Sequence, residues 1–322
     1  MAAINYPPYD SLPLRGGKRS AWAIWNRDGV PDHLGALNHL DSEARCAAAR
    51  EVVHGESFQL DWAYDEIGKP AFGRQGLTHN VIDYHKVTGE MAHDDVITFN
   101  TQCGSQWDGF MHYADQNLAS YYNGVKHGQN TIQDPASHSI HYWCKKGIVG
   151  RGVLLDWPRW LESTGKEPFS PISSRGLSVQ DMKLIAEHQG VQFSHGDILI
   201  IRTGFLKWYR EAPEQARSDA FDALRFAGVQ QGTETQRWLW DSRFAAVAGD
   251  AVSWECYPPP SDGSMLHQWL LPHVGIPIGE LWDLESLGEA CHRLKKWTFM
   301  LCSAPLNIPG GIASPPNVVA IL

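Results

Sequence analysis

Four polar side chains within one short segment are suited to work on a bound small molecule. Residues 99–113 contain Gln102, Gln106, Asp108 and His112, which follow one another at offsets of four, two and four. In a tight glycine-containing loop this spacing can direct several side chains into one cavity. A carboxylate and an imidazole at such positions can bind a metal ion or transfer a proton. The segment is therefore the main candidate for a functional site.

Both ionisable groups also have a purely structural interpretation. Asp108 precedes Gly109, and an Asp-Gly pair often forms a turn in which the carboxylate accepts backbone N–H groups. A single histidine is commonly a hydrogen-bonded structural residue. The offset of four between Asp108 and His112 nevertheless favours proton transfer by the histidine.

The same segment resembles the signature His-x-Gly-Thr-His-x-Asp-x-x-x-His of the cyclase family that includes kynurenine formamidase and isatin hydrolase. Residues 102–112 read Gln-Cys-Gly-Ser-Gln-Trp-Asp-Gly-Phe-Met-His. The glycine, the aspartate (Asp108) and the last histidine (His112) match the signature. Both earlier histidines are replaced by glutamine, at Gln102 and Gln106.

Other segments extend this resemblance to residues 35–322. Residues 196–204, Gly-Asp-Ile-Leu-Ile-Ile-Arg-Thr-Gly, are similar to the family's Gly-Asp-hydrophobic-Arg-Thr-Gly strand. Residues 151–156 resemble an earlier core strand, and residues 309–317 resemble the closing Gly-Gly-x-x-Ser-Pro segment. The resemblance implies a mixed-sheet α/β fold of the layered β/β/α type. We therefore expect a single catalytic domain over residues 35–322, preceded by an extended N-terminal arm, residues 1–34.

The resemblance also implies a set of site residues. A later family block contains a histidine and, further along, a glutamate that reach the metal cluster, and His267 and Glu280 occupy those positions. Their separation favours His267 over the nearby His273. The implied metal ligands are therefore Asp108, His267 and Glu280, and the implied acid–base pair is Asp108 with His112.

The two glutamines bear on the cofactor. An imidazole offers a basic nitrogen lone pair, whereas a carboxamide offers a weak neutral oxygen, so both replacements weaken zinc binding. We expect a divalent ion, Mn²⁺ or Zn²⁺, with Mg²⁺ as an alternative because hard ions tolerate amide oxygens. In a second alternative the site uses no metal, and Gln102 and Gln106 bind or polarise a substrate carbonyl. In a third, the protein only binds its ligand.

The aromatic content indicates the kind of substrate. The chain has 14 tryptophans, and Trp107, Trp254, Trp269 and Trp282 lie near the implied site positions. They favour a pocket for a flat, apolar or aromatic molecule, and we predict that Trp107 binds substrate together with the two glutamines. The expected function is hydrolysis of an amide or cyclic amide bond, similar to that of an arylformamidase. The alternatives are a metal-independent cyclase, dehydratase or isomerase, and a non-catalytic small-molecule binder.

Composition excludes several other classes. The net charge is −9, and acidic and basic residues are interspersed without a long Lys/Arg run, so nucleic acid is not an expected partner. The N-terminus lacks the pattern of a secretory signal, and no window approaches 18 consecutive apolar residues. The six cysteines form no Cys-x-x-Cys pair. We expect a cytoplasmic protein without membrane partners.

Local patterns predict the elements that must position the site. The expected helices cover residues 42–53, 179–189 and parts of 211–243, and the expected buried strands cover residues 153–155, 198–201, 245–248 and 297–302. The proline-rich start of the arm is poorly suited to fold alone and is placed to wrap a neighbouring subunit. We therefore expect a homodimer or a higher homo-oligomer.

Overall fold

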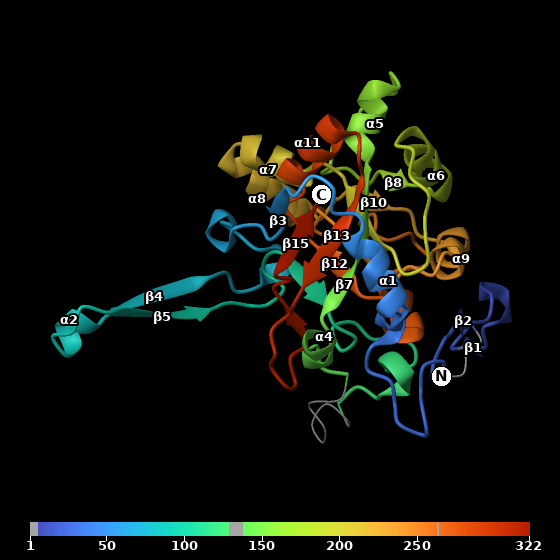
Figure 1. Cartoon of the computed structure of the whole chain (residues 1–322), viewed down its shortest axis with the longest axis horizontal. Helices are drawn as coiled ribbons and strands as arrows, with labels where there is room; N and C mark the ends of the chain where they lie inside the picture. Colours follow the sequence, from blue (N-terminus) through green and yellow to red (C-terminus); the bar gives the residue numbers. More distant parts are fainter. Residues whose placement is uncertain (1–5, 129–137, 263) are drawn as a thin grey trace.

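A large mixed sheet organises the protein (Figure 1). The computed structural model describes residues 6–128, 138–262 and 264–322. Nine strands of the described residues form this sheet, in the spatial order β14 (Ala313–Ser314), β6 (Gln106–Asp108), β12 (Ile278–Glu280), β11 (Ala246–Gly249), β9 (Ile198–Arg202), β7 (Ile148–Asp156), β13 (Thr298–Ser303), β15 (Val318–Ile321) and β3 (Ser57–Gln59).

The centre of the sheet is parallel and its two sides are antiparallel. β7, β9, β11 and β12 run in the same direction, β13, β15 and β3 add antiparallel pairs on one side, and β6 and β14 do so on the other. Every residue of β9 is buried, as expected for a parallel strand covered on both faces. The mixed α/β fold predicted from the sequence is confirmed, as are its four predicted strands.

One predicted strand is longer than its sequence pattern indicated. β7 begins at Ile148, five residues before the apolar run that marked it. Gly150 and Gly152 interrupt the pattern because neighbouring side chains fill the space above them. A Cβ atom at Gly152 would lie 2.2 Å from the ring of Phe299 on β13, and one at Gly150 would lie 2.6 Å from Leu40.

All of the described helices except α2 lie around the sheet and its ends. In chain order the helices are α1 (Ser42–Ala49), α2 (Tyr84–Val87), α4 (His141–Lys146), α5 (Trp157–Ser163), α6 (Val179–His188), α7 (Phe205–Glu211), α8 (Glu214–Ala223), α9 (Thr233–Asp241), α10 (His267–Trp269) and α11 (Glu285–Leu294). α1 packs on β7 and β13. None of the described helices is long and apolar enough to cross a membrane.

The predicted helices are present, with one difference in length. The Asp41 side chain accepts a hydrogen bond from the Ala44 backbone at 2.9 Å and starts α1 where predicted. α1 ends at Ala49, short of the predicted residue 53, because the following chain turns to donate hydrogen bonds from His54 and Gly55 to the Leu322 carbonyl. α6 begins after Ser178, whose hydroxyl accepts from the Asp181 backbone, and α8 and α9 occupy the predicted helical region.

The described part of the N-terminal arm packs on its own chain. Tyr6 stacks on Trp240 of α9, with ring centroids 4.3 Å apart, and Trp25 is buried in the main core. The Ala21 backbone donates to the His273 carbonyl in the π-helical turn η6 (Leu270–Val274). The arm contains the 3-10 turn η1 (Tyr9–Ser11) and the two-residue strands β1 (Leu14–Arg15) and β2 (Lys18–Arg19).

A long hairpin leaves the body of the protein. β4 (Thr78–Asp83) pairs with β5 (His93–Thr98), and both extend away from the sheet with α2 at their far end (Figure 1). The remaining elements are short: η2 (Gly35–His39), η3 (Tyr64–Glu66), η4 (Ala71–Gly73), η5 (Tyr122–Gly124), β8 (Gly176–Leu177) and β10 (Gly228–Val229).

Candidate active site

Two neighbouring strands bring distant parts of the sequence together at the site. β6 and β12 are antiparallel partners, with Glu280 opposite Gln106 and Ile278 opposite Asp108. Because alternate residues of a strand share one face, Gln106 and Asp108 point to the same side. The first residue of α10, His267, faces this side.

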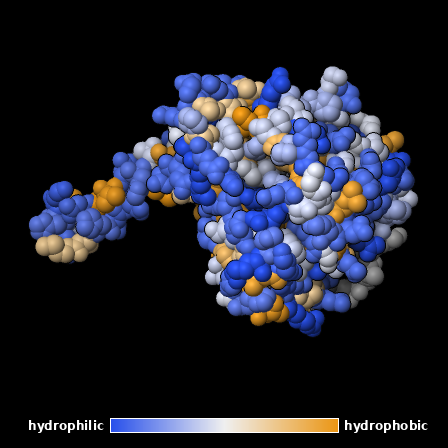
Figure 2. All heavy atoms as spheres, turned by 90° about the horizontal axis from the view of Figure 1, so that it is seen from above, coloured by the Kyte–Doolittle hydropathy of each residue, from blue (hydrophilic) through white to orange (hydrophobic). Residues whose placement is uncertain are grey.

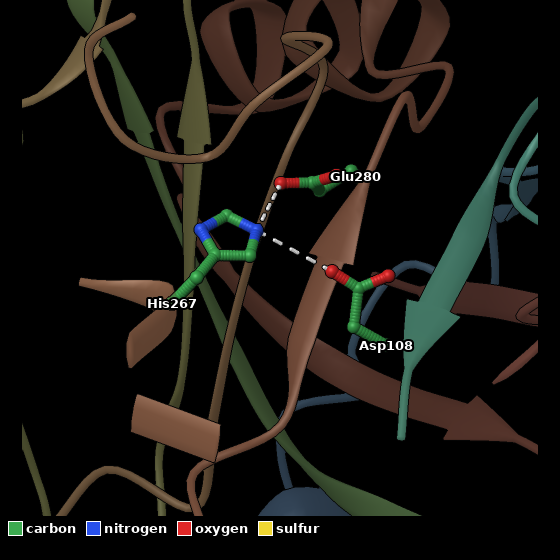
Figure 3. Close-up of side chains that lie close together, drawn as sticks. All are labelled: Asp108, His267 and Glu280. Carbon is green, nitrogen blue, oxygen red and sulfur yellow. Dashed lines mark ion pairs between the residues drawn. The ribbon is translucent and has the colours of Figure 1, made fainter. Parts of the chain in front are cut away.

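Three of the predicted residues form a compact cluster (Figure 3). His267 Nε2 lies 3.1 Å from Glu280 Oε1 and 3.5 Å from Asp108 Oδ2. One potential ligand atom from each residue lies within 4.8 Å of the other two, and all three residues are buried. His273, the alternative considered from the sequence, instead contacts Asp115 at 2.9 Å, away from this cluster.

A buried glutamate fixes the orientation of the histidine. His267 Nδ1 donates to Glu255 Oε1 at 2.6 Å, and the same carboxylate accepts the backbone N–H groups of His267 and Leu266 at 2.8 and 2.6 Å. These contacts leave Nε2 directed at the other two carboxylates. Sequence reasoning missed Glu255, and its only signal was a lone acidic residue within the buried run 251–256.

Both glutamines of the motif donate to the acidic residues. Gln102 Nε2 lies 2.6 Å from Asp108 Oδ1, and Gln106 Nε2 lies 3.2 Å from the same oxygen and 2.8 Å from Glu280 Oε2. Among the described residues, the buried Oε1 atoms of both amides accept no hydrogen bond. The two amides therefore donate hydrogen bonds to the Asp108 and Glu280 carboxylates, and the Oε1 atom of each glutamine remains available to a ligand.

The cluster strongly perturbs the titration of its members. Burial alone would raise the pKa of Asp108, but the His112 and His267 rings and the Gln102 amide outweigh it and lower that pKa to about 2. Burial and the charge of Asp108 raise the pKa of Glu280. Burial opposes the charged form of His267, yet its hydrogen bonds to carboxylates raise its pKa well above the ordinary value. Without a bound cation, these hydrogen bonds therefore favour the imidazolium form of His267.

His112 lies on the open side of the cluster. Its Nε2 atom is 4.0 Å from Asp108 Oδ2, and its side chain lines the adjoining cavity. Burial lowers the pKa of His112, with Asp108 acting in the opposite direction. The ring is therefore neutral near pH 7 and able to accept a proton.

A cavity of about 350 Å³ opens above the cluster. It is lined by Phe72, Arg74, His112, Tyr113, Val252, Ser253, Tyr257, Met265, His267 and Glu280. The walls combine aromatic rings with one guanidinium group. Arg74 lies 5.0 Å from the Phe72 ring and donates to the Gln102 carbonyl at 2.8 Å, and no carboxylate of the described residues pairs with it. No motif or spacing in the sequence indicated a site role for Phe72 or Arg74.

The tryptophans predicted near the substrate belong to the core. Trp107 is fully buried, donates to Ser303 Oγ at 2.9 Å and meets Trp282 edge to face. Trp254 contributes to the site through its backbone, which donates to Glu280 Oε1 at 2.8 Å. Trp269 donates its indole N–H to the Arg19 carbonyl. None of these four side chains lines the cavity.

The cluster fits a divalent cation. Asp108 Oδ2 is buried and accepts no hydrogen bond from the described residues, and it lies beside an imidazole nitrogen and a second carboxylate oxygen. Carboxylate oxygens and imidazole nitrogens are common ligands of divalent metal ions, and a catalytic zinc site uses three protein ligands beside an open position. The contact between His267 and Glu255 is the support that a metal-bound histidine requires on its other nitrogen.

The site combines titratable groups with perturbed pKa values and an aromatic pocket above them. This combination is typical of an enzyme active site. The profile of the putative cyclase family matches residues 33–256. The chain belongs to this family, which confirms the resemblance found in its motifs.

Solved structures agree with this assignment. The structure of a protein described as a novel cyclase is 29% identical, covers 94% of this chain and 99% of its own, and superposes with a TM-score of 0.81. Isatin hydrolase A from Labrenzia aggregata, bound to benzyl benzoate, shares the fold at 15% identity, with 88% and 98% coverage and a TM-score of 0.57. An isatin hydrolase bound to the product analogue thioisatinate also shares the fold, at 13% identity and a TM-score of 0.57; the match covers 89% of this chain and 97% of that one. A search of curated proteins gave no significant match.

Proposed function

We propose that this protein hydrolyses an amide or cyclic amide bond of a small aromatic molecule. The observation that carries the proposal is the convergence of Asp108, His267 and Glu280 at the floor of a cavity with His112 on its wall. The first three would hold a divalent cation. Such a cation, when bound, polarises a carbonyl group and lowers the pKa of a water molecule.

The chain's own groups have distinct tasks in this proposal. Glu255 holds His267 in the orientation that directs Nε2 to the carboxylates. His112 is neutral and close to Asp108, so it can take a proton from the attacking water and give one to the departing nitrogen. The free amide oxygens of Gln102 and Gln106 enlarge the oxygen-rich surroundings that Mn²⁺ or Mg²⁺ tolerates better than Zn²⁺ does.

The cavity walls support an aromatic substrate that carries or acquires a negative charge. Phe72, Tyr113 and Tyr257 offer ring faces and edges. Hydrolysis of a carbon–nitrogen bond releases a carboxylate and an amine, and Arg74 can pair with that carboxylate. The thioisatinate complex of one structural neighbour is consistent with a ligand of this chemistry.

The hydrogen bonds of the cluster also favour a second candidate, a metal-independent proton-transfer enzyme. The Gln102 and Gln106 amides donate to the two carboxylates, and the raised pKa of His267 supplies a positive charge between them. An imidazolium and two amide donors thereby compensate part of the negative charge of the cluster without a cation. In this case His112 moves the proton of a cyclisation, dehydration or isomerisation.

Metal analysis combined with a substrate panel separates the two candidates. Purified protein is tested on aryl formamides and cyclic amides before and after chelation, with metal content measured by mass spectrometry. The hydrolase predicts near-stoichiometric cation and turnover that chelation abolishes and Mn²⁺ restores. Full turnover by the chelated protein would reject the hydrolase mechanism in favour of the second candidate.

A histidine substitution separates an enzyme from a binder. We expect His112→Ala to reduce turnover by roughly 10²–10⁴-fold, the usual contribution of general acid–base catalysis, while the melting temperature and metal content stay close to wild type. His54→Ala, which removes an exposed histidine outside the cavity, is the matched control. A protein that binds ligands from the panel but turns none of them over, with or without the substitution, contradicts both catalytic proposals.

A further inference from the structure

A buried ionic group lies outside the catalytic cavity. Asp115 is fully buried, and its Oδ2 atom accepts hydrogen bonds from Lys18 Nζ at 2.6 Å and from His273 Nε2 at 2.9 Å. Hydrophilic residues predominate on the face of the protein shown in Figure 2, so a charged group in the interior is the exception. Burial of a charge is unfavourable unless the charge is paired, and the position of this group therefore requires an explanation.

The partners of Asp115 keep it ionised. Burial would raise the pKa of its carboxyl group, but the hydrogen bonds from His273 and Lys18 outweigh burial and lower that pKa to about 2. Burial lowers the pKa of His273, which favours its neutral form. Lys18 therefore provides the positive charge that pairs with the carboxylate. Removal of one partner of a buried pair leaves an uncompensated charge, so the lysine and the aspartate act as a unit.

A tight turn of the N-terminal arm places Lys18 beside Asp115. Gly16 and Gly17 join β1 to β2, and their φ angles of 55° and 82° lie in the left-handed region that favours glycine. A Cβ atom at Gly16 would lie 2.8 Å from Leu118 Cγ, so the turn packs directly on that residue. The Leu118 backbone in turn donates to Asp115 Oδ1 at 2.7 Å. The arm and the segment that contains the aspartate are therefore tightly packed on each other.

The same segment carries His112, which has no hydrogen bond of its own to hold its ring. Among the described residues its closest polar contact is Asp108, at 4.0 Å. The ring position therefore depends on the backbone, which is anchored on one side by Phe110 in the main core and on the other by Asp115. His267 differs, because a hydrogen bond from its own ring to a buried glutamate orients it directly.

The arm also holds the turn that follows α10. This turn, η6, contains His273, which contacts Asp115 through its side chain and accepts the Ala21 backbone N–H at 2.9 Å through its carbonyl. Trp22 stacks on the His273 ring at 5.9 Å between centroids and donates its indole N–H to the Pro272 carbonyl. One carboxylate therefore joins three segments: the arm, the segment of His112 and the turn next to the metal cluster.

We propose that Lys18 is a positioning residue, which through Asp115 sets the place of His112 relative to the metal cluster. Lys18 acts through another residue and touches neither substrate nor cation. A misplacement of about 1 Å caused by a change far from the reacting atoms can lower a rate by on the order of a hundredfold. The proposal rests on the proton-transfer role of His112, which both catalytic candidates share.

Steady-state kinetics of Lys18→Met test the proposal on any panel compound that the wild type turns over. We expect kcat to fall by roughly 10–100-fold while KM and metal affinity stay close to wild type, because the cavity walls and the support of His267 are unchanged. Lys18→Arg keeps the charge and should recover most of kcat. Asp10→Asn is the matched control, because it removes an exposed ion pair of the same arm, 2.8 Å from Arg237 of α9. Wild-type kcat in Lys18→Met would overturn the proposal.

A double variant covers the case in which Lys18→Met destabilises the protein. Lys18→Met combined with Asp115→Asn removes both charges and leaves no buried charge unpaired. Because the two residues act as a unit, the double variant should lose no more kcat than the more impaired single variant. Fully additive losses would contradict the proposed route through Asp115.

NMR of ring-labelled histidine reports on His112 without a substrate. Spectra of the full-length protein are recorded with Mg²⁺ as the added cation, and the His112 signal is assigned by its absence in His112→Ala. Lys18→Met should shift or broaden this signal, whereas Asp10→Asn should not. An unchanged signal in Lys18→Met, or the same change in both variants, would overturn the proposal. A shift specific to Lys18→Met in a protein that turns over no panel compound would support the positioning and reject only the proposed function.

Discussion

Replacing Glu255 with glutamine should weaken metal binding while leaving every candidate ligand in place. The carboxylate accepts three hydrogen bonds: from His267 Nδ1 at 2.6 Å, from the His267 backbone at 2.8 Å and from the Leu266 backbone at 2.6 Å. A glutamine has one acceptor oxygen and one NH₂ group. If its oxygen keeps both bonds to His267, its NH₂ group faces the Leu266 N–H, and that donor loses its partner.

The magnitude follows from these contacts. An unsatisfied buried donor costs about 1–3 kcal/mol of folding stability. The bond to His267 Nδ1 also changes from charge-assisted to neutral, and loss of such support for a metal-binding histidine typically lowers metal affinity by about 10–100-fold. That range corresponds to about 1.4–2.8 kcal/mol of binding free energy.

The assay is calorimetric titration of chelated protein with Mn²⁺ and Zn²⁺, with unfolding free energies from urea denaturation. Asp115→Asn is the control, because it removes another buried carboxylate from a histidine, His273, outside the cluster. We expect both variants to lose stability and only Glu255→Gln to lose affinity. Wild-type affinity in Glu255→Gln, or equal losses in both variants, would refute the reasoning.

Three further predictions follow from individual contacts. Burial would raise the pKa of Asp115, but hydrogen bonds, the largest from His273, lower it to about 2. Its stabilising contribution is therefore complete above roughly pH 4, and about 2 kcal/mol is lost as the pH falls towards 2. Urea denaturation across this range should show a smaller acid dependence for Asp115→Asn than for wild type. Gly152→Ala should destabilise the protein by about 1–3 kcal/mol, because its Cβ atom would meet the ring of Phe299, and thermal melting should show a lower midpoint. Arg74→Gln should lower the affinity for an aromatic carboxylate by roughly 10–100-fold, which corresponds to the loss of one hydrogen bond to a charged group. Titration with the matched neutral amide should show nearly the wild-type affinity.

The sequence predicted the parts of the site that lie in recognisable motifs. Asp108 is in the signature loop, and the family resemblance located His267 and Glu280, which the pairing of β6 with β12 and the position of α10 bring to the same place. No periodicity or spacing could indicate that Glu255 would support His267. A carboxylate that orients a metal-binding histidine must lie close to it in space, but it can stand at any separation from it in the sequence.

The same limit applies to the fold. Apolar runs predicted the buried strands such as β9, whereas the two glycines of β7 concealed its first half because their role is to admit neighbouring side chains. The projecting hairpin carries no continuous apolar run, since polar and charged residues alternate with its hydrophobic ones. Trp107 has a residue type typical of a substrate pocket, yet its position on β6 directs its side chain into the core.

The proximity of Arg74 to residue 78 links the pocket to the projecting hairpin. The cavity wall formed by Phe72 and Arg74 leads within a few residues into β4, so one short stretch of backbone belongs to both the pocket and the base of the hairpin. A ligand that holds this stretch in place therefore also restrains the base of the hairpin, and by thermodynamic reciprocity any contact that restrains the hairpin favours the ligand to the same degree.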